Sequence, residues 1–110
     1  MNQKEKALLF NDLHVKGDPL ILYNIWDAGS ANAVLEAGAS GFFVPGLMDE
    51  NLISEICDLS SLPVNIMMKP GVPSVNKLKQ LGVARISHGP FPYLSLMDTL
   101  KERAVSELKP

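Results

Sequence analysis

The chain has a single cysteine, Cys57, among 110 residues, which excludes an internal disulfide and any metal site built from several cysteines. No apolar run approaches the roughly 18 residues that a membrane-spanning helix needs. The first residues, MNQKEKALLFNDLH, mix charged and apolar positions unlike a signal peptide. Lysine and arginine are spread along the chain rather than clustered, and the net charge is −2. The composition therefore predicts a soluble, cytoplasmic protein that binds neither nucleic acid nor a membrane.

What is present is a regular alternation of short apolar runs with segments of helical spacing. Hydrophobic residues make up 46% of the sequence and charged residues 20%, which predicts one packed domain over residues 1–110. The apolar runs begin about 21 residues apart, and they are Leu20–Ile25, Gly41–Val44, Pro63–Met67 and Val83–Ser87. Because strands that are apolar on both faces and alternate with helices form parallel sheets, the pattern predicts an α/β fold.

The helical segments carry their own start signals. Asp27, Asp49 and Ser74 are suited to be N-caps of the helices that follow the first three runs. A further helix is expected over residues 3–13. The fourth run leads into the longest predicted helix, whose apolar stripe consists of Tyr93, Leu96, Met97, Leu100, Ala104 and Leu108.

Candidate functional residues are expected in the loops after the strands, where parallel α/β folds place their reactive groups. Asn65 lies within an apolar strand, so its amide needs a hydrogen-bond partner if it is buried, and a ligand-facing role stays open for it. For Asp27 and Asp49, a helix-capping role is favoured over a catalytic role. His88 is interpreted as a solvated loop residue, because no second titratable group stands beside it to orient it.

Several sequence motifs of known catalytic or binding chemistry are missing. The sequence contains no Gly-rich phosphate loop, no nucleophile elbow and no His-Glu metal helix. Cys57 stands among apolar neighbours, which favours a core residue over a nucleophile. The glycine and proline residues at 70–73 and 89–90 mark turns. The free backbone N–H groups there are a weak signal for an anion-binding pocket.

Two blocks of the chain resemble a known enzyme family. Residues 9–38 read LFNDLHVKGDPLILYNIWDAGSANAVLEAG, and residues 37–90 contain FVPGL, PVNIMMKPG and GVARISHGP in that order. The chain resembles the isocitrate lyase and phosphoenolpyruvate mutase family, especially its short phosphonomutase-like and methylisocitrate lyase-like members. The first block is similar to the family's leading helix, first strand and first helix, and the second to strands six, seven and eight with their helices.

The resemblance implies descent from an eight-stranded TIM-type barrel. Family members use Mg²⁺ to break or rearrange C–C or P–C bonds in small α-keto or enolate carboxylates. Their metal-binding and catalytic loops belong to strands two to five, which have no counterpart here, so no cofactor and no metal ligand is expected to be retained. The positions carried over as substrate-side residues, with a small carboxylate as the implied ligand, are Asn24, Asp27, Asn65, Ser87 and Gly89.

An internal deletion is the hypothesis that accounts for the missing strands. Residues 36–39, EAGA, match both the end of the family's first helix and the end of the helix before strand six. A closed barrel takes about 250 residues, so a partial barrel of about four parallel strands is expected. Because strands eight and one are neighbours in the parent barrel, we expect Leu20–Ile25 to pair with Val83–Ser87.

Half a barrel would leave its inner face uncovered. By alternation this face is predicted to carry Phe43, Val64, Ile66 and Ile86, so the chain is expected to be a homo-oligomer or prone to aggregation. The leading functional hypothesis is a truncated, catalytically incompetent family member. The alternatives are a non-enzymatic carboxylate-binding or subunit-interaction module, and an active lyase or mutase assembled from paired half-barrels.

Overall fold

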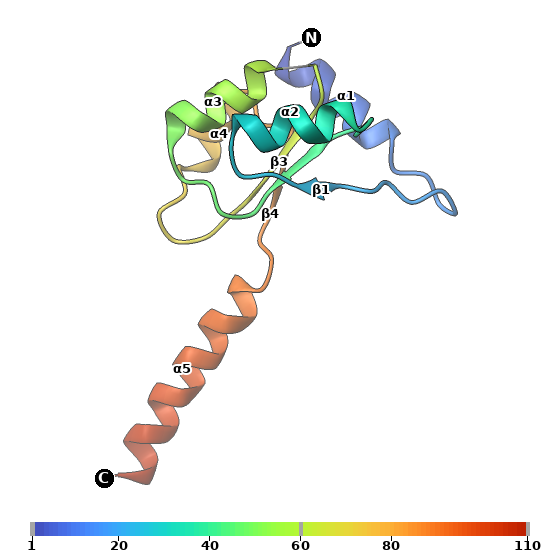
Figure 1. The fold of residues 1–110 in the computed structure, drawn as a ribbon. Helices are drawn as coiled ribbons and strands as arrows, with labels where there is room; N and C mark the ends of the chain where they lie inside the picture. Colours follow the sequence, from blue (N-terminus) through green and yellow to red (C-terminus); the bar gives the residue numbers. More distant parts are fainter. Residues whose placement is uncertain (1, 60, 110) are drawn as a thin grey trace.

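The computed structural model describes residues 2–59 and 61–109, which form helices and strands in alternation (Figure 1). The elements of this part are α1 (Gln3–Asp12), β1 (Tyr23–Asn24), α2 (Ala28–Glu36), β2 (Phe42–Val44), α3 (Glu50–Leu59), β3 (Val64–Met67), α4 (Val75–Leu81), β4 (Arg85–Ser87) and α5 (Phe91–Leu108). The strands form one parallel sheet in the order β1-β2-β3-β4. The predicted α/β class and the positions of the four strands are confirmed.

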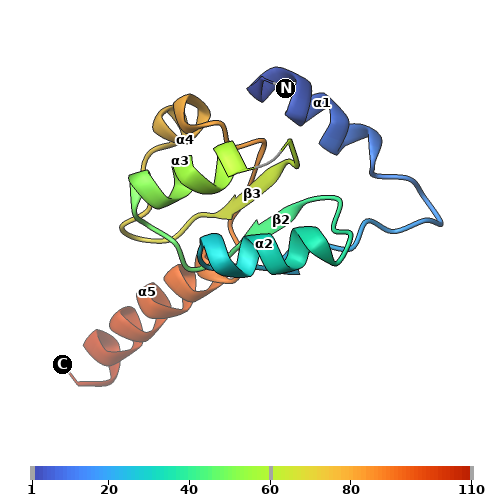
Figure 2. The ribbon, with the colours of Figure 1, turned by 45° about the horizontal axis from the view of Figure 1, so that its top comes forward.

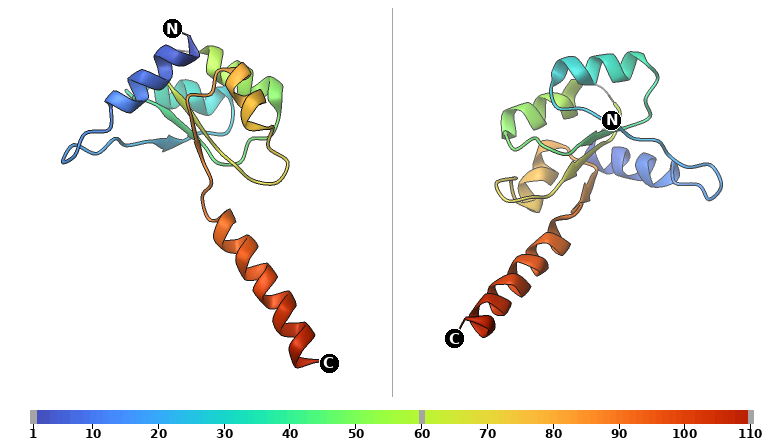
Figure 3. Two further views of the ribbon diagram at one scale, coloured as in Figure 1. Left: turned by 180° about the vertical axis from the view of Figure 1, so that it is seen from behind. Right: turned by 60° about the horizontal axis from the view of Figure 1, so that its bottom comes forward.

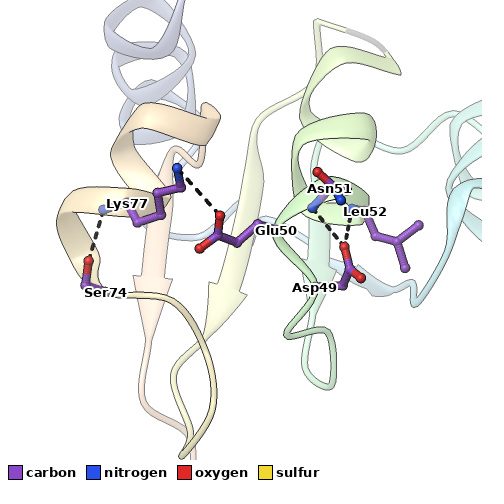
Figure 4. Close-up of polar contacts among 6 residues, drawn as sticks. All are labelled: Asp49, Glu50, Asn51, Leu52, Ser74 and Lys77. Carbon is purple, nitrogen blue, oxygen red and sulfur yellow. Dashed lines mark hydrogen bonds and ion pairs between the residues drawn. The ribbon is translucent and has the colours of Figure 1, made fainter.

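The predicted helix caps are present at α3 and α4 (Figure 4). Asp49 Oδ1 accepts hydrogen bonds from the backbone N–H groups of Asn51 and Leu52, at 2.8 and 3.1 Å. Ser74 Oγ accepts one from the backbone N–H of Lys77 at 3.2 Å. These bonds satisfy N–H groups that have no partner inside the first turn of a helix, which explains why each helix begins where it does.

The hydrophobic core lies between the sheet and helices α2, α3 and α4, which all cover one face of the sheet (Figure 2). Phe42, Val44, Val64 and Ile66 point into this core and are fully buried. The helices contribute Ala31, Ile53, Ile56, Cys57 and Leu78. Fully burying a large apolar side chain stabilises a fold by roughly 1.5–3 kcal/mol, so this layer is the main source of stability. The interpretation of Cys57 as a core residue is confirmed.

The sheet order differs from the order expected from a family barrel. Strand β1 pairs with β2, where Tyr23 lies opposite Phe42, and β4 pairs with β3 at the far edge. The predicted pairing of Leu20–Ile25 with Val83–Ser87 is therefore wrong. Helix α2 leads from β1 into β2 through a short connection, and such a crossover places consecutive strands side by side. In the part of the chain that the structure describes, the four strands do not close on themselves, so β1 and β4 are the edges of the sheet.

The predicted inner face is also wrong, except at Phe43. The register places Val44 opposite Ile66 and Ile66 opposite Ile86, and this row faces the helices. Phe43 instead lies opposite Asn65 on the other side of the sheet, together with Arg85. Because the strands carry apolar residues on both sides, alternation alone could not tell which side the helices cover. The side that α2–α4 leave uncovered, called the open face below, carries Asn24, Phe43, Asn65, Met67, Arg85 and Ser87.

Helix α1 lies at the amino ends of the strands (Figure 3). Lys6 Nζ donates a hydrogen bond to the Cys57 carbonyl at 2.6 Å, which ties α1 to the last turns of α3. Gln3 Nε2 donates to the Val83 carbonyl at 3.1 Å, just before β4. The Phe10 ring is only 2% exposed and abuts Gly41, just before β2. These contacts attach α1 to the amino end of the sheet.

Helix α5 projects away from the rest of the molecule (Figures 1 and 3). None of its residues is buried. The radius of gyration is 17.0 Å, whereas a compact chain of this length has about 13 Å. The predicted apolar stripe thus lies on a helix that nothing covers. No helix among residues 2–59 and 61–109 is both long and apolar enough to span a membrane.

Candidate functional site

The carboxyl edge of the sheet, where all four strands end, carries the loops in which site residues were expected. On the open face, Asn24, Phe43, Asn65 and Arg85 lie in one row across the four strands. Ser87 lies one step further toward the carboxyl edge, opposite Met67. The structure therefore brings Asn65 and Ser87 together, while Asn24 is separated from them by strand β2.

Asn65 has the hydrogen-bond partners that its burial demands. Its side chain is fully buried, Nδ2 donates to Ser87 Oγ at 3.0 Å, and Oδ1 accepts from Arg85 Nη1 at 3.4 Å. The prediction that the amide needs a partner is confirmed. Sequence reasoning missed Arg85, although its position two residues before Ser87 places both side chains on the same side of β4.

Asp27 is engaged at the start of α2. Its Oδ1 accepts a hydrogen bond from the Ser30 backbone N–H at 2.7 Å, and Ser30 Oγ in turn accepts from the Asp27 N–H at 3.1 Å. The backbone and side-chain hydrogen bonds of Ser30 lower the pKa of Asp27 below its ordinary 3.8. This carboxylate therefore acts as a helix cap, and the substrate-side role assigned to it stays a prediction.

Gly89 marks the turn from β4 into α5. Its φ of 53° lies in the left-handed region, and a Cβ at this position would overlap the Met67 sulfur. The glycine thus lets the backbone turn sharply while lying against the open face. His88 beside it is exposed, and its carbonyl accepts a hydrogen bond from the Phe91 N–H at 3.3 Å.

The acidic residues nearest the carboxyl edge do not form the ligand set that Mg²⁺ requires, which is several oxygens directed at one point. Asp27 and Asp49 cap helices. Glu50 pairs through Oε2 with Lys77 Nζ at 3.5 Å (Figure 4). In the described part of the chain, no three His, Cys, Asp or Glu side chains gather closely enough to hold a metal ion. These residues therefore do not fit the metal that the resemblance implies.

Comparison with known proteins identifies the ancestry of this scaffold. Residues 31–108 match the family model described as phosphoenolpyruvate phosphomutase. The chain belongs to the phosphoenolpyruvate phosphomutase family. This membership confirms the resemblance seen in the sequence blocks.

Relatives within the phosphoenolpyruvate phosphomutase family are considerably longer than this chain. Uncharacterized proteins from two Mycobacterium tuberculosis strains, CDC 1551 and H37Rv, are each 41% identical over 59 residues, which cover 54% of this chain and 22% of the relative. A Burkholderia cenocepacia crystal structure described as a phosphonomutase is 47% identical, with a TM-score of 0.58, over 69% of this chain and 31% of that one. The chain therefore spans well under half the length of these proteins.

A second Burkholderia cenocepacia structure, described as a lyase/mutase, matches nearly the whole fold. It covers 97% of this chain and 44% of that one with a TM-score of 0.74, at 20% identity. This likeness concerns the fold alone. It agrees with a partial barrel of four parallel strands, with the helices on one side as in a barrel wall.

Proposed function

We propose that this chain is a truncated, catalytically incompetent scaffold of the phosphoenolpyruvate phosphomutase family, produced by an internal deletion. The observation that carries the proposal is the engagement of the acidic groups near the carboxyl edge. Asp27 and Asp49 each accept backbone hydrogen bonds at a helix start, and Glu50 is paired with a lysine. Asn65 is likewise satisfied within the sheet. Recruiting these groups for a metal or a carboxylate would therefore break existing contacts.

Turnover measurements test the proposal directly. The purified chain is incubated with oxaloacetate, with pyruvate and with a phosphonate, each with and without Mg²⁺, and calorimetry follows binding in the same samples. We expect no metal-dependent turnover of any of these compounds. Turnover that requires Mg²⁺ and disappears with a chelator would overturn the proposal. Binding without metal and without turnover would favour a carboxylate-binding module instead.

A second candidate function, a subunit-interaction module, is favoured by helix α5. Its apolar stripe is highly exposed, with Tyr93 at 64%, Leu96 at 66% and Leu100 at 59%. An exposed apolar stripe on a long helix is typical of a surface that another protein covers. We propose that a second copy of this chain covers it, which would make the protein a homo-oligomer.

Sedimentation of two matched variants tests this association. Leu100→Glu places a charge on the stripe, whereas Ser95→Glu places the same charge on the opposite side of α5. We expect the wild type and Ser95→Glu to sediment as oligomers and Leu100→Glu as a monomer. A wild type that stays monomeric at high concentration would contradict the association.

The alternative of an active lyase or mutase built from paired half-barrels depends on the two sheet edges. Strands β1 and β4 each lack a strand neighbour on their outer side in the described part of the chain. A second copy related by a twofold axis parallel to the strands would place β4 of one copy beside β1 of the other in parallel orientation. Oligomers that also show Mg²⁺-dependent turnover would favour this alternative over both other functions.

A further inference from the structure

A groove with basic side chains lies at the amino end of the open face, at the opposite end of the strands from the carboxyl edge. Two adjoining pockets, of about 380 and 470 Å³, share His14 and Arg85 in their walls. Lys16, Leu20 and Leu22 line the larger one, and Phe10 lines the smaller. We call this feature the basic groove. Nothing in the function proposed above uses it.

The Arg85 guanidinium contacts two side chains of its own chain, and neither of them neutralises its charge. Asn65 Oδ1 accepts a hydrogen bond from Nη1 at 3.4 Å, and the guanidinium carbon lies 5.9 Å from the centre of the Phe10 ring. Phe10 is buried, so it offers a fixed surface for this cation–π contact. Within residues 2–59 and 61–109, no carboxylate lies at ion-pair distance from Arg85. The positive charge at the wall of the groove is therefore unpaired.

His14 is oriented by the same phenylalanine. Its Nδ1 lies 2.5 Å from the Phe10 carbonyl oxygen, and because a carbonyl can only accept, Nδ1 carries the proton. The two rings lie 5.5 Å apart, centre to centre. The other ring nitrogen, Nε2, has no hydrogen-bond partner among the described residues. Phe10 thus positions an imidazole and a guanidinium on the same groove.

Lys16 adds a third basic group from the turn that follows α1. The turn is closed by a hydrogen bond from the Asp18 N–H to the Val15 carbonyl at 3.1 Å, and Gly17 within it has φ of 87°. Asp18 belongs to this turn but lines a different pocket, beside α2. Among the residues that the structure describes, no acidic side chain lines the basic groove. In a chain of net charge −2, this is a locally positive site.

We propose that the basic groove binds a small phosphate monoester, with its phosphate at Arg85 and Lys16 and its apolar part against Leu20 and Leu22. A guanidinium presents N–H donors in a planar fork that matches the oxygens of a phosphate. The two negative charges of the ester meet Arg85 and Lys16, and in the described part of the chain neither of these has a carboxylate at ion-pair distance. The aliphatic wall then favours an ester with an apolar body over inorganic phosphate alone.

Titrations with phenyl phosphate and with inorganic phosphate, followed by calorimetry at low salt, test the site. We expect phenyl phosphate to bind at least threefold more tightly than inorganic phosphate. Arg85→Gln should weaken phenyl phosphate binding at least tenfold, and Lys16→Gln about threefold. Lys79→Gln is the matched control, because it removes one positive charge from an exposed position on α4 outside the groove. Its affinity should equal that of the wild type.

Three results would overturn the proposal. One is the absence of phenyl phosphate binding to the wild type, and another is an equal loss in Lys79→Gln and Lys16→Gln, which would indicate nonspecific attraction. The third is an Arg85→Gln variant that keeps its phosphate affinity but changes its sedimentation, which would assign the guanidinium to a carboxylate of a second copy. Because Arg85 also contacts Asn65, circular dichroism checks the fold of that variant. Exposed Lys16 gives an independent test that does not disturb the sheet.

Discussion

Replacing Asn65 with alanine tests whether the polar contact between β3 and β4 stabilises the sheet. The bond from Asn65 Nδ2 to Ser87 Oγ is 3.0 Å long, and such a bond contributes a net of about 1 kcal/mol. The 3.4 Å bond from Arg85 adds little, because water can replace Asn65 at an exposed guanidinium. Truncating a fully buried side chain leaves a small cavity, which costs about 1 kcal/mol more. The expected loss is about 2 kcal/mol, or roughly 8 °C in Tm.

A double-mutant cycle separates the hydrogen bond from the cavity. Urea unfolding, followed by far-ultraviolet circular dichroism, is measured for the wild type, Asn65→Ala, Ser87→Ala and the double variant. We expect losses of about 2, 1 and 2 kcal/mol for the three variants, because the double variant loses the shared bond only once. The coupling energy is then about 1 kcal/mol. Losses that add to within about 0.3 kcal/mol would refute the assigned hydrogen bond.

Three further predictions concern single positions. Gly89→Ala should lower the free energy of unfolding by at least about 1 kcal/mol, since alanine is strained at φ of 53° and its Cβ would overlap the Met67 sulfur. The pKa of Asp27 is lower in the folded chain than in the unfolded chain, so its carboxylate stabilises the fold at pH values above the unfolded-state pKa. This stabilisation is lost as the pH falls through the folded-state pKa. Between about pH 5 and pH 2, a range that spans the ordinary aspartate pKa, the urea midpoint of Asp27→Asn should therefore fall less than that of the wild type. Burial raises the pKa of Cys57 to about 11, so its thiol should resist a disulfide reagent at neutral pH until the chain unfolds.

Each of these predictions has a matched control. Gly46→Ala should change the unfolding free energy by less than about 0.5 kcal/mol, because a Cβ there meets nothing within 4 Å. Asp98→Asn, at an exposed position on α5, should leave the pH dependence of the wild type unchanged. The Cys57 thiol should react promptly in urea. A Gly89→Ala variant as stable as Gly46→Ala, or a thiol that reacts in the folded chain, would contradict the structure.

Local signals predicted most of the secondary structure and some of the candidate site. Asp49 and Ser74 stand directly before the helices they cap, and the information needed to predict a cap lies within three residues of sequence. The demand of Asn65 for a partner also followed from local context, because an amide in the middle of an apolar run must be satisfied when the run is buried.

Features that depend on distant residues were not predictable in the same way. Strand β1 was wrongly expected to pair with β4, because that expectation came from the closed barrel that the resemblance implies, whereas this sheet is open and β1 pairs with β2. The assignment of Val64 and Ile66 to the open face failed because alternation divides a strand into two sides without telling which side the helices cover. The periodicity of α5 predicted an apolar stripe, but a stripe does not reveal what covers it. Arg85 was missed because its partners come from α1 and β3.

The order of the strands in the sheet has a consequence for how this chain folds. Because that order follows the order along the chain, paired residues such as Tyr23 and Phe42, or Asn65 and Arg85, are only about 20 positions apart. No pairing requires the closure of a long loop, so the entropic barrier to each step is low and folding is expected to be fast. Each strand-helix unit adds to the edge left by the previous one, as repeats do in a solenoid. A chain that grows in this way can lose or gain a unit at a helix end while the remaining pairs keep their partners.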